Sequence, residues 1–139
     1  MSKTDLPLGI DFSKLTPIEH MFGDDFEETQ QLAALFEEAE LYLASFAGCE
    51  AIKRAYFGLG VSDFIGIFLF EFLPKDESKE RFLWVVTGDV PSACLAADTC
   101  PDPTSALRAY IEHARGMCNV RSVTLLETVV LKHYTQDSA

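Results

Sequence analysis

Apolar and polar positions alternate with helical spacing in the first third of the chain. Asp24 and Asp25 are each followed three residues later by a glutamate, which is the spacing of a capping box. The pattern predicts a helix over residues 24–47, continued by a second helical stretch over 49–57 that Gly58 and Gly60 end. The apolar residues of the helix 24–47 recur at intervals of three and four and form one stripe: Leu32, Leu35, Phe36, Ala39, Tyr42, Leu43 and Phe46.

The middle of the chain predicts a β-hairpin. Residues 61–73 are aromatic and β-prone, and both faces of such a strand are apolar, so both need a cover. Pro74 ends this strand, a polar loop follows, and residues 81–87 form the return strand. A turn at residues 88–91 leads to a third short strand over 92–97. The two faces of the first strand are Phe64, Phe68, Phe70 and Phe72 on one side and Ile65, Ile67, Leu69 and Leu73 on the other.

Asp102 and Pro103 open a further helix over 102–116, with Asp as the N-cap and Pro in the first helical position. Residues 120–134 fit either a strand or a helix, and their β-branched content favours a strand. We therefore expect an α+β domain. It has a small antiparallel sheet, made of the hairpin 61–73/81–87 plus one or two further strands, against helices 24–57 and 102–116.

The chain has the length of one domain, residues 1–139. Residues 1–22 read as an irregular arm with a helical turn near 16–19, which apolar side chains pin to the body, and residues 135–139 as a frayed tail. The pinning side chains are Phe12, Leu15, Ile18 and Phe22. If all helices covered one face of strand 61–73, the arm or a second copy of the chain would cover the other, and a homodimer is the second of these alternatives.

Charge narrows the function classes. The sequence has 22 Asp and Glu against 11 Lys and Arg, a formal charge of −11, which argues against a basic surface for nucleic acid. Residues 1–50 carry 11 of the acids and two bases, so the negative charge is concentrated early. We expect one exposed acidic ridge on the first helix that binds a basic protein partner. Its residues are Asp24, Asp25, Glu27, Glu28, Glu37, Glu38 and Glu40.

Targeting and membrane signals are absent from the pattern. The first residues hold no apolar core of a secretory signal, and the longest apolar run, near 64–73, is interrupted by Glu71 and is too short for a membrane helix. The cysteines form no C-x-x-C pair and are expected to be free and reduced. These observations predict a cytoplasmic protein that does not enter a membrane.

No arrangement of residues announces a cofactor or a metal. The segment from Gly58 to Gly60 lacks the third glycine of a dinucleotide-binding loop, and no Cys or His pair has zinc-ligand spacing, so we expect neither. A thiol nucleophile needs a base nearby. The candidates are Cys94 just after the turn, His113 on the next helix and Asp89 in the turn, although each also fits a structural role.

Residues 82–96, followed by a capped helix, resemble a stretch found in an uncharacterised family of small acidic bacterial proteins. That stretch runs Trp-Val-Val-x-Gly-Asp-x-Pro-x-Ala-x-Leu, and Cys94 stands here where the family has Tyr. The resemblance covers about a quarter of the chain. It implies a bacterial origin and a shared strand-turn-strand-helix unit, and it implies no activity. The matching residues are Trp84, Val85, Val86, Gly88, Asp89, Pro91, Ala93, Leu95 and Tyr110.

Three functions follow from these patterns. The first, which we favour, is a non-catalytic acidic protein, of the immunity or inhibitor kind or an adaptor, that binds a basic protein. The second is a cysteine-dependent enzyme using Cys94 and His113. The third is a module for a small ligand or for assembly, with an aromatic pocket between the hairpin and the helix 102–115. Its lining would be Phe68, Phe70, Trp84 and Tyr110.

Overall fold

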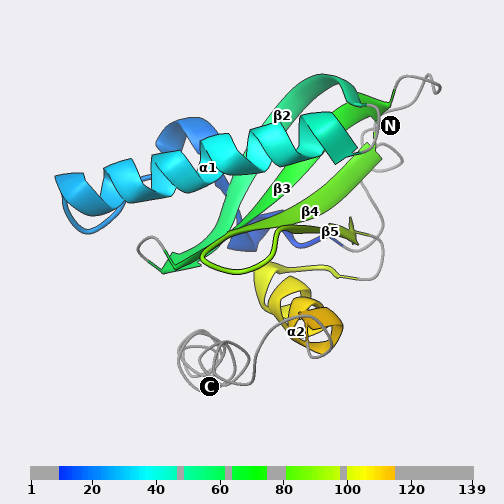
Figure 1. The fold of residues 1–139 in the computed structure, drawn as a ribbon. Coiled ribbons are helices and arrows are strands. Elements are labelled where there is room, and N and C mark those ends of the chain that lie inside the picture. Colours follow the sequence, from blue (N-terminus) through cyan, green and yellow to red (C-terminus); the bar gives the residue numbers. More distant parts are fainter. Residues whose placement is uncertain (1–9, 47–48, 62–63, 75–80, 98–99, 115–139) are drawn as a thin grey trace.

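The structure, a computed structural model, describes residues 10–46, 49–61, 64–74, 81–97 and 100–114. Two helices pack on a sheet of five strands in this part of the chain (Figure 1). The expected α+β class is therefore confirmed. The elements are η2 (Phe12–Lys14), β1 (Thr16–Pro17), η3 (Ile18–His20), α1 (Phe26–Phe46), β2 (Cys49–Val61), β3 (Ile65–Pro74), β4 (Arg81–Gly88), β5 (Ala93–Ala96) and α2 (Pro103–Ala114).

The sheet is an antiparallel meander in the order β1-β2-β3-β4-β5. The expected hairpin is β3 and β4, where Phe68 pairs with Val85 and Leu69 with Trp84. The expected third strand is β5, which pairs with β4. The prediction for residues 120–134, the tail from 135 and the first nine residues of the arm lie outside the described residues.

The two helices cover opposite faces of the sheet (Figure 1). Leu35 and Ala39 of α1 pack on Phe68 and Phe70, whereas α2 packs on the face that carries Leu69. The two faces of β3 are thus as the alternation predicts, except that Phe64 precedes the strand and packs on the α2 side. Because the chain covers both faces itself, the uncovered-face argument for a homodimer no longer holds.

Residues 49–57, expected to be helical, belong instead to strand β2. Their local composition favours a helix, but β3 is buried on both faces, and each of its edges needs a partner for its backbone polar groups. β2 supplies one of those partners, with three irregularities in its register. The expected turn at 16–19 is likewise split, because Thr16 and Pro17 pair with Phe57 and Tyr56 before η3 begins.

Side-chain hydrogen bonds hold the start of α2 and the segments that precede it in the sequence. Asp102 accepts a hydrogen bond from the Ser105 amide at 2.8 Å, as expected of an N-cap before Pro103. The buried Trp84 donates its indole N–H to the carbonyl of Cys100 at 2.8 Å. Tyr110 donates its hydroxyl to the carbonyl of Pro91 at 2.6 Å. Trp84 of β4 and Tyr110 of α2 therefore hold the segments before α2 through their polar groups.

Two glycines lie where α1 approaches the sheet. Gly60 of β2 pairs with Gly66 of β3. A Cβ atom on Gly60 would come within 2.7 Å of a methyl group of Leu32, and one on Gly66 within 3.2 Å of the Leu35 side chain. The missing side chains let α1 lie close to β2 and β3 at this point.

Candidate functional site

Two of the seven predicted partner-binding carboxylates stabilise the start of α1. Asp25 accepts a hydrogen bond from the Glu28 amide at 2.8 Å. Glu28 in turn accepts one from the Asp24 amide at 2.6 Å, which is one residue earlier than in a standard capping box. The spacing Asp25–Glu28 is therefore the one that caps the helix. Both carboxylates accept hydrogen bonds from backbone amides at the start of the helix.

The other glutamates on α1 point in more than one direction. Glu27, Glu37 and Glu38 are exposed, whereas Glu40 is half-buried on the side of the helix that faces β2. Burial, with a smaller effect from Glu37, raises the pKa of the Glu40 carboxyl. The expected single ridge is thus wrong in detail. Asp25 and Glu28 cap the start of the helix. Glu27, Glu37 and Glu38 lie on its exposed side, which we call the outer face.

Negative charge on α1 has no counterpart on the same helix. Its 21 residues include the five glutamates of the predicted set and no Lys, Arg or His. Asp24 lies just before it and is also exposed. A basic molecule that approaches this side of the protein therefore meets carboxylates without a competing cation from the helix itself.

Large apolar side chains are exposed at the same helix, and the sequence reasoning missed them. Phe26 is 76% exposed and Leu41 is 72% exposed, and Phe22, just before the helix, is 76% exposed. The sequence held a signal for two of them, because Phe26 and Leu41 fall outside the apolar stripe of α1. The expectation that Phe22 pins the arm is wrong, whereas Leu15 is buried and Phe12 and Ile18 pack on the core.

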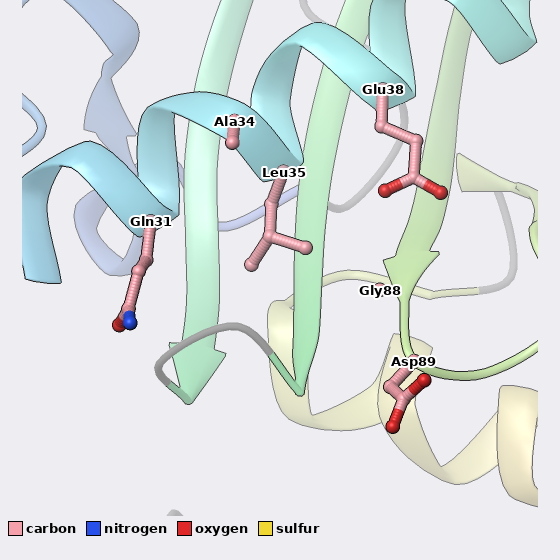
Figure 2. A pocket seen from close by; sticks show the side chains of 6 residues that line it. All are labelled: Gln31, Ala34, Leu35, Glu38, Gly88 and Asp89. Atoms are coloured by element: carbon pink, nitrogen blue, oxygen red, sulfur yellow. The ribbon is translucent and has the colours of Figure 1, made fainter.

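A surface hollow of about 410 Å³ lies between α1 and the turn after β4. Figure 2 shows Gln31, Leu35 and Glu38 projecting from the helix, with Asp89 at the end of β4. Asp89 is exposed, and its amide donates to the Phe64 carbonyl at 2.7 Å. Asp89, the catalytic candidate that the sequence places in a turn, therefore lines the same hollow as Glu38. Its carboxylate adds to the negative charge beside α1.

A second hollow, of about 430 Å³, lies on the other side of α1, against β1, η3 and β2. It is lined by Glu40 and Glu19 but also by Lys53 and Arg54. Arg54 lies 3.9 Å from the Glu71 carboxylate across the β2–β3 pair. Charges of both signs meet here, so this side of the helix lacks the uniform negative character of the outer face.

The three catalytic candidates do not come together. Cys94 is half-buried and packs on the α1 side of the sheet, and burial raises the pKa of its thiol to about 12. His113 is exposed on α2, which packs on the opposite side. The sheet therefore separates this thiol from the imidazole that would have to activate it, and a raised pKa is the reverse of what a thiolate nucleophile needs.

The expected aromatic pocket is likewise divided by the sheet. Phe68 and Phe70 pack under α1, whereas Trp84 and the α2 residue Tyr110 pack together on the opposite side of the sheet. All four side chains are fully buried. They fill two cores and do not line one cavity.

Among the described residues, no three His, Cys, Asp or Glu side chains are grouped as ligands of a metal ion. The two described α-helices include none that combines the length and the apolar character needed to cross a membrane.

No family model matches the chain, and neither a curated protein nor a solved structure matches it. The family resemblance of residues 82–96 stays a prediction.

Proposed function

We propose that this protein is a non-catalytic binding protein that recognises a basic protein through the outer face of α1, which carries Glu27, Glu37 and Glu38. The observation that carries the proposal is the charge of that helix, which bears glutamates and no base on an exposed face. Apolar side chains at Phe26 and Leu41 on the same face add area that a bound partner would remove from water. An inhibitor or immunity-type role, or an adaptor role, fits such a surface.

The separation of Cys94 from His113 supports a binding role over the cysteine-dependent enzyme. The burial of Phe68, Phe70, Trp84 and Tyr110 likewise leaves the small-ligand module without its expected pocket. The binding surface we propose is Glu27, Glu37 and Glu38 with their apolar neighbours. Asp25 and Glu28 are left out because they cap the helix.

The test is a pull-down from the source cells with the protein as bait and mass spectrometry of the captured proteins. The variant is Glu37→Lys/Glu38→Lys, which reverses two exposed charges on α1. Glu40 is left unchanged, because it is half-buried on the side of α1 that faces β2 and does not lie on the exposed face. The matched control is Glu19→Lys/Glu112→Lys, which changes the net charge equally at two exposed positions outside α1.

We expect the wild type and the control to capture a protein with a strongly basic surface, and the double reversal on α1 to lose it. Capture should also weaken as salt rises, because long-range attraction is screened beyond about 8 Å at physiological ionic strength. Capture that survives Glu37→Lys/Glu38→Lys, or that fails equally with the control, would contradict the proposal.

A further inference from the structure

The outer face of α1 combines charge with an apolar line. Among residues 26–45, the part of the helix whose side chains the structure describes, ten are exposed, and half of these are apolar. Phe26 and Leu41 are the large ones, and they lie 15 positions apart, which is about 22 Å along a helix. The apolar members are Phe26, Ala33, Ala34, Leu41 and Ala44, and the acidic ones are Glu27, Glu37 and Glu38.

The shape of this face suits another helix. Ala33 and Ala34 lie between the two large side chains and carry nothing beyond Cβ, so a second helix axis can come close there. Leu41 is one helical turn from both Glu37 and Glu38, so the apolar line and the charges run side by side. Apolar positions flanked by charges along one helix are how helices select their partners in coiled coils.

The sign of the charge decides what can occupy the face. A second copy of this chain would bring its own Glu27, Glu37 and Glu38 against the same three residues, with no base on either helix. Like charges placed opposite each other disfavour that pairing. The occupant therefore has to carry Lys or Arg beside its apolar residues.

We infer that an amphipathic, basic helix of the partner lies along α1. Its apolar side chains contact Phe26 and Leu41, and its Lys or Arg side chains contact Glu37 and Glu38. This inference rests on the proposed function and adds to it the kind of element that binds and the residues it contacts.

The test uses a fluorescent peptide with the length of α1, 21 residues, made of Leu and Lys in a heptad pattern. A second peptide has the same composition in shuffled order, so that its Leu residues share no face. Binding to the full-length protein is measured by fluorescence anisotropy. The variants are Phe26→Ala and Leu41→Ala. Their control is Phe22→Ala, which removes an equally exposed ring just outside the helix.

We expect the heptad peptide to bind more tightly than the shuffled one, and Phe26→Ala and Leu41→Ala each to weaken it by about five- to tenfold. Phe22→Ala should leave binding unchanged. Equal binding of both peptides, or equal weakening by all three substitutions, would overturn the helical partner. Loss of binding in Glu37→Lys/Glu38→Lys without any effect of Phe26→Ala and Leu41→Ala would leave the proposed function standing and remove this inference. No effect of any of these substitutions would remove both.

Discussion

The hydroxyl group of Thr87 donates a hydrogen bond of 3.0 Å to the main-chain carbonyl of Leu35, 52 residues earlier in the sequence. Thr87 is fully buried near the end of β4, and Leu35 is a buried residue of α1. This bond joins the helix to the strand next to the hollow that Glu38 and Asp89 line. This hydrogen bond therefore adds a polar contact to the apolar packing that holds α1 on the sheet.

Thr87→Val should lower the free energy of unfolding by about 1 kcal/mol, because the shape is kept while the donor to Leu35 is lost. Urea unfolding followed by circular dichroism measures the change. A variant as stable as the wild type, or more stable, would show that this hydrogen bond has no net effect.

Cys94 should react slowly with iodoacetamide near neutral pH. A pKa of about 12 in place of 9.0 lowers the fraction of thiolate, the reacting form, by about a thousandfold. The rate should rise with pH far above pH 9, and in urea Cys94 should react like an ordinary thiol. Peptide mass spectrometry resolves this site from the other cysteines. Rapid, selective labelling of Cys94 at pH 7 would restore the cysteine-dependent enzyme.

The same pKa predicts a pH dependence of stability. The folded protein favours the neutral thiol of Cys94, so this contribution to stability is fully present below about pH 9. It is lost as the pH rises toward about 12. Cys94→Ala should show a smaller loss of stability over this alkaline range than the wild type. The measurement is thermal unfolding at several pH values, and parallel curves for the two proteins would contradict the assignment.

Asp25→Ala should destabilise the protein by about 1 kcal/mol, since the carboxylate of Asp25 accepts the Glu28 amide at the start of α1. Asp24→Ala is the matched control, because it removes the same charge one residue away while the Asp24 amide keeps its bond to Glu28. Denaturant unfolding compares the two. Equal losses would mean that charge near the helix end matters here and the cap does not.

Gly88→Ala should destabilise the protein by about 2 kcal/mol, because Gly88 has a φ of 132° and its Cβ would collide with the backbone of Phe64. Gly60→Ala is the comparison, since the atoms it would meet belong to the side chains of Leu32 and Phe57, which can move. The loss measured by thermal unfolding should be larger for Gly88. The reverse order would contradict this account of the turn.

The sequence predicts the elements whose signals are local. The two apolar faces of β3 announce a covered strand, and Asp102 with Pro103 marks the start of α2. The prediction is wrong at residues 49–57 of β2, where Ala, Lys, Arg and Glu favour a helix. This segment is a strand because β3 needs a hydrogen-bonded neighbour. Pairing between strands is a property of the assembled sheet, and no window of the sequence around residues 49–57 contains it.

The candidate site is predictable only in part. The amphipathic spacing of α1 predicts the exposure of Glu27, Glu37 and Glu38, but it also predicts an exposed Glu40, which is half-buried. Asp25 and Glu28 have capping spacing, although we also expected both to bind the partner. The separation of Cys94 from His113 depends on which face of the sheet each helix covers, and sequence spacing does not determine that side. The exposed Leu41 was visible as an apolar residue off the stripe of α1, because a helix wheel puts it beside Glu37 and Glu38.

The meander order of the strands has a consequence for how the chain folds. Each strand pairs with its neighbour in sequence, so β2, β3, β4 and β5 can join one after another with short loops to close. The buried side of α1 packs on Phe68, Phe70 and Val85, which follow the helix in the sequence and are therefore synthesised after it. During synthesis the helix therefore emerges before its cover, and its apolar stripe is open to chaperones or to neighbouring chains until β4 has left the ribosome.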